Sequence, residues 1–480
     1  MSAPGTIGHY IDGARVEGKA AFDSINPSDT SDIVARVPDA DAAVVDAAVA
    51  AAAAAQPAWA AASPELRSDV LERISTLIFQ KKDELSQLLA REEGKTLPES
   101  TGEVLRAARI FRFFSGEALR RTGVTNDSTR PGIETTTYRE PVGVFALIAP
   151  WNFPIAIPTW KSAPALAFGN AVVLKPSELT PVLASALADI VHEAGMPKGV
   201  FNMVFGRGET GRAMVEHPGI SGISFTGSQA TGEKIALTAA SRQVRLQLEM
   251  GGKNPLVVLD DADLERAVQS ALDGGFFATG QRCTASSRLI VTEGIHDKFV
   301  KLLGERAAAL RVGNALHATT QVGPVASAAQ LEKVQSYVDI AAREGARCVT
   351  GGDRPVTEQN GYYIRPTLLS ETTGAMRVNN EEIFGPVVSV LRVKDYDAAL
   401  AAANAGTFGL SAGIMTSSLK YAHHFTRNVR AGMVMVNLPT AGVDYHVPFG
   451  GSRKSSFGPR EQGPAAIEFY TQIKTAYTWA

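Results

Sequence analysis

The chain has 480 residues, more than the roughly 250–300 at which a single hydrophobic core stops growing, so we expect more than one domain. Hydrophobic residues make up 45% and charged residues 20%, and a formal net charge of −2 gives no electrostatic reason to expect a nucleic-acid or anionic-membrane partner. Two cysteines cannot form a disulfide framework, which favours a reducing cytoplasm.

The sequence predicts no signal peptide and no membrane span, and it predicts two helices in the first part of the chain. Residues 1–22 show no basic start followed by an apolar run, so no signal peptide is expected. The chain has no stretch of about 18 uninterrupted apolar residues, so no membrane span is expected. An alanine-rich tract at 47–55 predicts a helix, and an amphipathic pattern that begins at Ser63-Pro64-Glu65 predicts another.

From about residue 140, short apolar runs alternate with longer helical patterns. The runs at 142–150, 170–176, 199–206, 220–228 and 244–249 predict buried strands, with a helix ending near Phe168 and another starting near Thr180. Strands that are apolar throughout and separated by helices predict a parallel sheet covered on both faces. Such crossovers are typical of a doubly wound, Rossmann-like nucleotide-binding domain.

The same pattern restarts after Gly251-Gly252 and predicts a second α/β unit. Its expected strands are NPLVVLDD (254–261), RLIVTEG (288–294), VVSVLRV (387–393), SAGIMTSS (411–418) and GMVMVN (432–437). We place a domain boundary near residue 251. The predicted fold class is therefore α/β with two doubly wound, Rossmann-like domains.

Two further segments are neither core strands nor core helices. Residues 125–140 are polar and rich in threonine, which predicts a hairpin. The tail at 465–479 alternates well enough to predict an exposed strand. Because exposed strand edges promote aggregation unless they are covered, we expect these segments to pair with each other or with another subunit.

Cys283 is the first candidate for chemistry. It stands beside Arg282 in the segment FATGQRCTASSR, and a neighbouring cation lowers the pKa of a thiol and favours the nucleophilic thiolate. The alternative is that Cys283 is a small buried hydrophobic residue. Cys348, in the short run GARCVTGG, is expected to belong to the core.

Glu249 ends one predicted strand and Asn152 follows another. A carboxylate at the carboxyl end of a parallel strand lies where open α/β sheets bind ligands, so Glu249 could act as a general base. Asn152 lies between two prolines in PWNFP, and its amide could donate to an oxyanion together with the Cys283 N–H. The alternatives are a solvated glutamate and an asparagine that satisfies its own turn.

Several strand ends could bind a dinucleotide. The segment from Phe225 to Gly232, FTGSQATG, leads from a strand into a helix, where backbone N–H groups can hold a pyrophosphate. Gly208 follows an earlier strand, and Lys175 and Glu178 flank another strand end. An acidic residue that accepts from a ribose hydroxyl favours NAD over NADP, because it would repel a 2′-phosphate.

Further motifs bear on the cofactor contacts, on metal binding and on the class of enzyme. Glu382 and Phe384, in EEIFGP, could reach across a cleft to a nicotinamide ribose. The eight histidines show no metal-ligand spacing and one thiolate cannot form a zinc site, so no metal is expected. The chain has no G-x-S-x-G motif, which gives no support for a serine hydrolase.

In their order and spacing these motifs resemble the NAD(P)-dependent aldehyde dehydrogenase superfamily over essentially the whole chain. The motifs that carry the resemblance are PWNFP (150–154), KPSE (175–178), FTGSxxxG (225–232), LEMGGKNP (248–255), GQRC (280–283), EEIFGP (381–386) and PFGG (448–451).

The resemblance implies a covalent mechanism. Cys283 would attack an aldehyde to form a thiohemiacetal whose oxyanion is held by Asn152 and the Cys283 N–H. Hydride transfer to the nicotinamide would leave a thioester, and Glu249 would activate the water that releases the acid. The implied cofactor is NAD or NADP, with NAD favoured by Glu178. The implied cofactor contacts are Trp151, Lys175, Ser177, Glu178, Gly208, Phe225, Thr226, Gly227, Ser228, Gly232, Glu382 and Phe384.

The resemblance also implies a domain plan and a self-association. Residues 1–124 and 141–250 would form the dinucleotide-binding domain, and residues 251–440 the catalytic domain. Residues 125–140 and 464–480 match the family's oligomerisation arm, which implies a homodimer or homotetramer. A cytoplasmic enzyme that acts on a small-molecule aldehyde, without a nucleic-acid or membrane partner, is expected.

The substrate is the least defined feature. Trp160 stands where succinate-semialdehyde enzymes carry an arginine, which argues against that substrate. Arg106, Arg109 and Arg112 share a helical pattern, and Arg106 or Arg282 could bind a carboxylate, although a solvated basic face is equally consistent. The segment from Thr440 to Phe449 looks most like the α-ketoglutaric semialdehyde (2,5-dioxopentanoate) dehydrogenases.

Other activities stay open at this stage. Phe153, Trp160, Phe277 and Phe449 could form an apolar tunnel for an aromatic aldehyde of the benzaldehyde or vanillin type. A non-redox cysteine esterase would use the same Cys283 and Glu249. A catalytically silent homologue is disfavoured, because the nucleophile, the base, the oxyanion amide and the cofactor motifs are all present.

Overall fold

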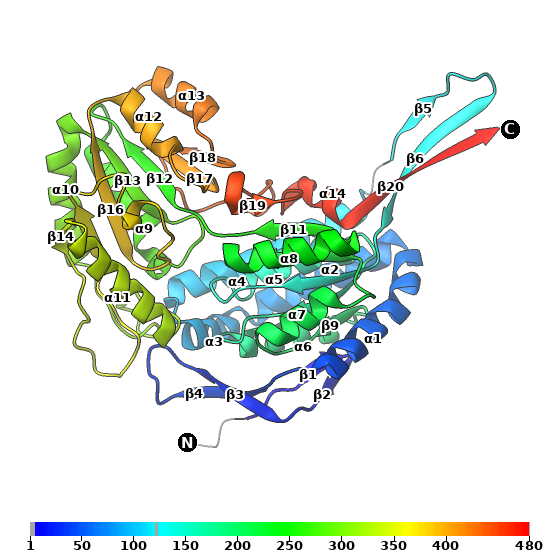
Figure 1. Cartoon of the computed structure of the whole chain (residues 1–480). Coiled ribbons are helices and arrows are strands. Elements are labelled where there is room, and N and C mark those ends of the chain that lie inside the picture. The colour runs from blue at the N-terminus through cyan, green and yellow to red at the C-terminus, as the bar shows by residue number, and fades with distance from the viewer. Residues whose placement is uncertain (1–4, 121–122, 480) are drawn as a thin grey trace.

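The structure is a computed structural model that describes residues 5–120 and 123–479. Figure 1 shows two lobes and a projecting arm: the first sheet and its helices form the larger lobe, the second sheet forms the lobe at the upper left, and the arm carries the C-terminus. The chain therefore has an α/β fold with two sheet-based units, as the alternation of strands and helices predicts.

The first sheet has a parallel centre and antiparallel edges. Its strands, in spatial order, are β19 (Ser456–Phe457), β11 (Arg245–Glu249), β10 (Gly222–Thr226), β7 (Val144–Ile148), β8 (Ala171–Lys175), β9 (Phe201–Met203), β1 (His9–Ile11) and β2 (Ala14–Val16). The five strands from β11 to β9 are the predicted ones and pair in parallel. The antiparallel edge strands β1, β2 and β19 were not predicted, because they are short and only partly apolar.

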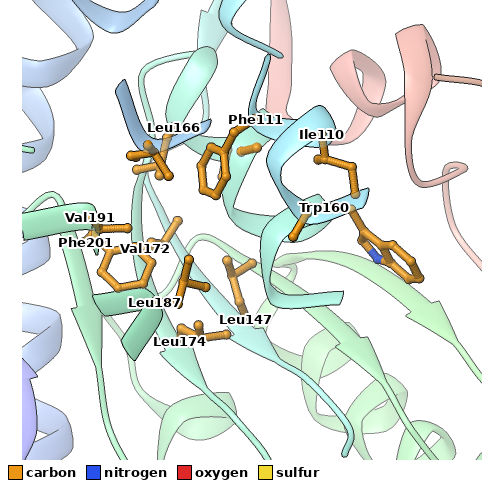
Figure 2. Close-up of a cluster of buried hydrophobic side chains, with 14 of the residues drawn as sticks. Ile110, Phe111, Leu147, Trp160, Leu166, Val172, Leu174, Leu187, Val191 and Phe201 are labelled. Carbon is orange, nitrogen blue, oxygen red and sulfur yellow. The ribbon is translucent and has the colours of Figure 1, made fainter. Parts of the chain in front are cut away.

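Helices cover both faces of this sheet. On β7, Phe145 and Leu147 pack in one hydrophobic cluster, whereas Val144 and Ala146 pack in another, as the period of a strand that is buried on both faces requires. Figure 2 shows the first cluster, with Trp160 at its margin. Its helices are α2 (Pro64–Gln80), α3 (Lys82–Glu93), α4 (Leu97–Ala118), α5 (Ala156–Ala167), α6 (Pro181–Glu193) and α14 (Ala466–Tyr470).

The opposite face is covered by α1 (Ala42–Ala61), α7 (Gly208–Glu216) and α8 (Gln229–Arg242). By length and composition alone, α1 is apolar enough to cross a membrane. In the structure its residues Val45, Ala48, Val49 and Ala52 are buried in the hydrophobic cluster on this second face of the sheet. This helix is the one predicted from the alanine-rich tract.

The second sheet has the order β14 (Arg347–Thr350), β15 (Thr367–Ser370), β16 (Val387–Val393), β13 (Ser286–Thr292), β12 (Asn254–Val258), β17 (Ser411–Met415) and β18 (Met433–Val436). All neighbours pair in parallel except β14 with β15. The surrounding helices are α9 (Leu264–Gly275), α10 (Glu293–Ala308), α11 (Ala328–Arg343), α12 (Tyr396–Asn404) and α13 (Leu419–Asn428). Cys348 lies on the edge strand β14 and is exposed, so its prediction as a core residue was wrong.

Two smaller sheets complete the fold. In the arm, β20 (Thr471–Trp479) pairs antiparallel with β6 (Ile133–Pro141), which also pairs with β5 (Thr125–Asp127). The tail and the threonine-rich segment are therefore hydrogen-bonded to each other, and together they project from the larger lobe (Figure 1). Near the N-terminus, β3 (Ala20–Ile25) and β4 (Ile33–Pro38) form a separate hairpin.

Candidate active site

Cys283, Glu249 and Asn152 line one cavity. They come from different parts of the fold: Glu249 ends β11, Asn152 lies in the turn between β7 and α5, and Cys283 precedes β13 of the second sheet. The other lining residues are Pro150, Trp151, Ile157, Trp160, Thr226, Gly227, Ser228, Met250, Gly251, Gln330, Lys333, Glu382, Phe384 and Phe449. A nucleophile, a carboxylate and a side-chain amide therefore face a shared space, although they are far apart in the sequence.

The loop before Cys283 is held in an unusual conformation. Ala278 and Thr279 have φ values of 50° and 54°, in the left-handed region that residues with a Cβ rarely occupy. The surroundings stabilise this loop, because Glu99 Oε1 accepts from the Ala278 N–H at 2.6 Å and Asn254 Nδ2 donates to the Cys283 carbonyl at 2.8 Å. The loop can therefore hold the thiol in a defined place.

The surroundings of Cys283 oppose the ionisation of its thiol. Burial, together with the negative charges of Glu249, Glu382 and Glu461, raises its pKa to about 12, while the Thr284 N–H acts in the opposite direction. At neutral pH the sulfur is therefore protonated, and a base has to take its proton before it can act as a nucleophile.

Arg282 does not face this cavity. Its guanidinium donates to the Asp273 carbonyl and lines a separate small cavity with Ser287 and Glu382. The expectation that Arg282 contacts the substrate or assists the thiolate therefore has no geometric support. Adjacency in the sequence places the two residues together, but their side chains point to different cavities.

Glu249 is a buried carboxylate. It is 2% exposed, and Ser456 Oγ donates to its Oε2 at 2.6 Å. Burial, and then the charge of Glu461, raise the pKa of Glu249 well above its usual value, while Lys161 and Arg460 lower it. A raised pKa suits a group that must both accept and return a proton near neutral pH.

Behind Glu249 lies a buried ion pair that the sequence did not reveal. Lys161 Nζ contacts Glu461 Oε1 at 2.5 Å and donates to Ser224 Oγ at 2.8 Å. Both charged side chains are almost completely buried, at 0% and 2% exposure. The pair sets the electrostatic environment of Glu249, because Glu461 and Lys161 shift its pKa in opposite directions.

Asn152 is fixed from both sides. Its Nδ2 donates to the Gln281 carbonyl at 3.0 Å, which directs the amide toward the cysteine loop, and its own carbonyl accepts from Lys95 Nζ at 2.7 Å. Lys95 is in turn paired with Glu103 at 2.6 Å, with 2% and 1% of the two side chains exposed. Glu103 Oε1 also accepts from the Ile155 N–H at 3.1 Å at the start of α5.

A second cavity continues from the first over the carboxyl ends of β7, β8 and β10. Both cavities are lined by Pro150, Trp151, Thr226, Gly227 and Ser228. Of the predicted cofactor residues, the second cavity alone contains Lys175, Ser177, Glu178, Gly208 and Phe225, and the first alone contains Glu382 and Phe384. Gly232 lines neither, and an added Cβ there would clash with the Met250 sulfur.

The residues of this long cleft fit an extended dinucleotide. Ser228 caps the N-terminus of α8 by accepting from the Thr231 N–H at 3.3 Å, so the positive end of that helix opens into the cleft. Thr226 Oγ1 is buried there without a partner in the described part of the chain. Glu178 stands 4.0 Å from Lys175 Nζ and remains half-exposed, free to accept from a hydroxyl.

At the opposite end, Glu382 and Phe384 close the cleft. Glu382 Oε1 accepts from the Gly252 N–H at 2.9 Å, and an added Cβ at Gly251 would overlap the Glu382 carboxylate. The Phe384 ring meets the Trp151 ring edge to face, with centroids 5.4 Å apart. Gly251 and Gly252 are therefore needed for this close approach of the two lobes.

The aromatic residues divide into two groups. Trp160 and Phe449 line the catalytic cavity with ring centroids 5.5 Å apart. Phe153, predicted to line the substrate tunnel, instead packs under the ammonium of Lys95, 4.1 Å from its ring centroid, and does not line the cavity. Its prediction as a substrate residue is therefore not supported by the geometry, because its ring contacts Lys95, which precedes α4, and not the cavity.

The three arginines of α4 differ in their exposure and in their contacts. Arg109 and Arg112 are exposed, whereas Arg106 stacks over the Trp160 ring at 5.6 Å. Its Nη1 donates to the Val443 carbonyl, its Nη2 donates to Gln462 Oε1 at 3.1 Å, and its Nε is buried without a partner in the described residues. Arg106 thus lies directly behind the aromatic wall of the cavity.

Two polar residues of the cavity were missed by the sequence reasoning. Gln330 and Lys333 lie on α11, and Gln330 Nε2 donates to the Phe384 carbonyl at 2.7 Å. Burial lowers the pKa of Lys333. Their spacing of three residues places both side chains on one face of α11. The sequence contains a signal for this helix, because Ser327 is a typical N-cap residue directly before it.

Comparisons with known proteins agree with this geometry. The sequence model described as the aldehyde dehydrogenase family matches residues 15–476. An alpha-ketoglutaric semialdehyde dehydrogenase of Bacillus subtilis is 42% identical over 94% of this chain and 93% of its own length. An alpha-ketoglutarate semialdehyde dehydrogenase of Haloferax volcanii is 43% identical over 98% of both chains.

Enzymes with a different named substrate match as well. Betaine aldehyde dehydrogenase 1 of Rhizobium meliloti is 43% identical over 99% of this chain and 98% of its own length. The solved structure of a Staphylococcus aureus betaine aldehyde dehydrogenase in complex with NAD+ has a TM-score of 0.96 and 35% identity, covering 98% of this chain and 95% of that one. The chain therefore belongs to the aldehyde dehydrogenase family.

Proposed function

We propose that the cavity oxidises an aldehyde to a carboxylic acid through a covalent intermediate on Cys283. The observation that carries the proposal is that Cys283, Glu249 and Asn152 line a single cavity that opens into a dinucleotide-shaped cleft. Such a cavity contains a nucleophile, a base and a hydrogen-bond donor in reach of one carbonyl group.

In the first step, Glu249 in its ionised form accepts the thiol proton and Cys283 Sγ bonds to the aldehyde carbon. The carbonyl oxygen becomes an oxyanion, to which Asn152 Nδ2 and the Cys283 N–H donate. Asn152 Nδ2 leaves the Gln281 carbonyl to do so, and the Lys95 bond keeps its backbone in place.

A nicotinamide held in the cleft would accept the hydride of the thiohemiacetal carbon, and a thioester on Cys283 would remain. Glu249 releases the thiol proton to solvent, and its carboxylate then takes a proton from a water molecule that adds to the thioester carbon. Expulsion of the Cys283 sulfur releases the carboxylic acid, and the proton returns to the sulfur or to solvent.

We propose NAD as the preferred cofactor. Glu178 supports it, because the half-exposed carboxylate could accept from a ribose hydroxyl and would repel a 2′-phosphate. Lys175 does not offset this repulsion fully, since its ammonium already donates to the Pro176 and Gly206 carbonyls at 3.0 and 2.7 Å.

For the substrate we propose α-ketoglutaric semialdehyde, which would be oxidised to 2-oxoglutarate. Arg106 supports a carboxylate-bearing aldehyde through its charge: it does not itself line the cavity, but its guanidinium lies against Trp160 of the cavity wall and its buried Nε has no partner in the described residues. Its positive charge also opposes a quaternary ammonium group such as that of betaine aldehyde. Trp160 and Phe449 favour an aromatic aldehyde as the second candidate, and a non-redox esterase reaction at Cys283 is a remote one.

We further propose that the arm associates with a second copy of this chain. Its strands leave large apolar side chains exposed, namely Val124, Tyr138, Ile473, Tyr477 and Trp479. Exposed apolar residues on strands of this kind are typical of a surface that another subunit covers. The composition and the family are consistent with a cytoplasmic location.

The test is steady-state reduction of NAD and of NADP by the purified protein, with Cys283→Ala as the control. The aldehydes are α-ketoglutaric semialdehyde, betaine aldehyde, benzaldehyde and butanal. The proposal expects the highest kcat/KM with α-ketoglutaric semialdehyde and NAD. A preference for betaine aldehyde or benzaldehyde would refute the substrate, and ester hydrolysis without nicotinamide reduction would refute the oxidation.

A further inference from the structure

A small, partly open cavity lies in the second lobe and shares no lining residue with the proposed catalytic cavity. Lys253, Arg288 and Ser411 line it, and they come from three neighbouring strand positions: just before β12, on β13 and at the start of β17. In the sheet β12 lies between β13 and β17 (Figure 1). The cavity has room for about one water-sized occupant.

Each of these three residues directs an unpaired polar atom into the protein interior. Lys253 Nζ, Arg288 Nε and Ser411 Oγ are all buried without a hydrogen-bond partner in the described residues. The three side chains belong to residues that are 5%, 4% and 2% exposed. Buried polar groups are normally satisfied, so three orphaned groups around one cavity indicate a missing partner.

Neither cation forms a close ion pair with a residue that the structure describes. Arg288 donates through Nη1 and Nη2 only to the carbonyls of Asn379 and Ala403, at 3.4 and 3.2 Å, which fixes its plane and leaves Nε free. Burial alone lowers the pKa of Arg288 to about 10. Two buried positive charges without a partner are costly unless a negative charge is close.

The charges that surround Lys253 do not remove this deficit. Burial lowers the pKa of Lys253 to about 7, and Arg288 and Lys333 act in the same direction. Glu382 and Glu381 oppose them, so negative charge partly offsets that of Lys253, whereas burial is the one influence on Arg288 and no described carboxylate compensates it.

We propose that this cavity binds one small monovalent anion of halide size, held by Lys253 Nζ, Arg288 Nε and Ser411 Oγ. All three groups can donate, and a halide accepts from several donors at once. A water molecule can accept from the two cationic donors and donate to Ser411 Oγ, but it carries no charge to offset the guanidinium of Arg288. Sulfate and phosphate are too large for the cavity.

The position of the anion site connects it to the cysteine loop. Asn254 directly follows Lys253, and its Nδ2 donates to the carbonyls of Cys283 and Ala285, at 2.8 and 3.0 Å. Its Oδ1 accepts from the Ser411 N–H at 3.0 Å. An anion at Lys253 therefore stabilises the strand ends that support this loop, and its binding raises the stability of the folded enzyme.

The experiment compares thermal unfolding of the full-length protein in chloride, bromide and gluconate at constant ionic strength. The melting temperature is expected to rise saturably with chloride and bromide and to stay constant with gluconate, which is too large to enter. Crystals grown in bromide are expected to show one anomalous peak within hydrogen-bonding distance of Lys253 Nζ.

Variants separate this site from general salt effects. Lys253→Met is expected to abolish the halide dependence, whereas Lys301→Met, which removes an exposed lysine, is expected to preserve it. Ser411→Ala keeps both charges and is expected to weaken halide binding about tenfold, since it removes one hydrogen bond to a charged group. The proposal is overturned if chloride and gluconate give the same melting curves, or if Ser411→Ala leaves the halide affinity unchanged.

Discussion

Arg106 provides the sharpest test of how the cavity selects its substrate. Replacing it with leucine removes the guanidinium behind Trp160 and retains much of the apolar bulk. A hydrogen bond to a charged group contributes about 1.5–3 kcal/mol. If Arg106 Nε binds the substrate carboxylate, that loss corresponds to a decrease of about 10- to 150-fold in kcat/KM, at about 1.4 kcal/mol for each factor of ten.

The same substitution has a cost that does not depend on the substrate. It leaves the Val443 carbonyl and the Gln462 side chain without their donor, which can disturb the cavity for every aldehyde. The informative quantity is therefore the ratio of kcat/KM for α-ketoglutaric semialdehyde to kcat/KM for butanal, which has no carboxylate. Losses common to both substrates cancel in that ratio.

The assay is initial-rate nicotinamide reduction with both aldehydes for the wild type, Arg106→Leu and Arg109→Leu. Arg109 is the matched control, because it lies on the same helix, carries the same charge and is exposed. We expect the ratio to fall at least about tenfold in Arg106→Leu and to stay within about twofold in Arg109→Leu. A ratio that Arg106→Leu leaves unchanged would show that this arginine only supports the cavity wall.

Two further predictions concern the cavity and its support. Glu249→Gln removes a negative charge that raises the pKa of Cys283, so the pH at which iodoacetamide alkylates Cys283 half-maximally should fall. Turnover should drop about 10²- to 10⁴-fold, because the base is lost. An upward shift of the alkylation pH would contradict the electrostatic argument. Lys95→Met leaves Glu103 buried without its cation and should lower the free energy of unfolding by about 3–5 kcal/mol, measured by urea denaturation. Adding Glu103→Gln should recover part of that loss, and a double variant no more stable than Lys95→Met would show that the pair is not the cause.

Much of the architecture follows from local sequence patterns. The runs around β7, β8 and β10 are largely apolar, and a parallel sheet covered on both faces buries such strands almost completely. The short edge strands β1, β2 and β19 carry no such pattern, because their pairing depends on neighbours that are distant in the chain. Sequence patterns therefore predict the centre of a sheet better than its edges.

The sequence also indicated which residues could carry the chemistry. Cys283, Glu249 and Asn152 each stand in a short motif. The carboxyl ends of β7 and β11 meet at one edge of the first sheet, so the convergence of Asn152 and Glu249 could be expected, whereas Cys283 precedes a strand of the second sheet and was placed with them by the family resemblance. The support around them could not. Lys95 reaches the Asn152 carbonyl across 57 residues, and the pairing partner of Lys161 lies 300 residues away.

Only the tertiary structure decided where side chains of similar sequence context point. Arg282 adjoins Cys283 but faces another cavity, and Arg106 is buried behind Trp160 whereas Arg109, three residues later, is exposed. The sequence determined the residue types, the strand periodicity and the family motifs, because these depend on neighbours along the chain. The direction of each side chain and the charge that surrounds it depend on packing between elements far apart in the chain, so the structure alone could assign them.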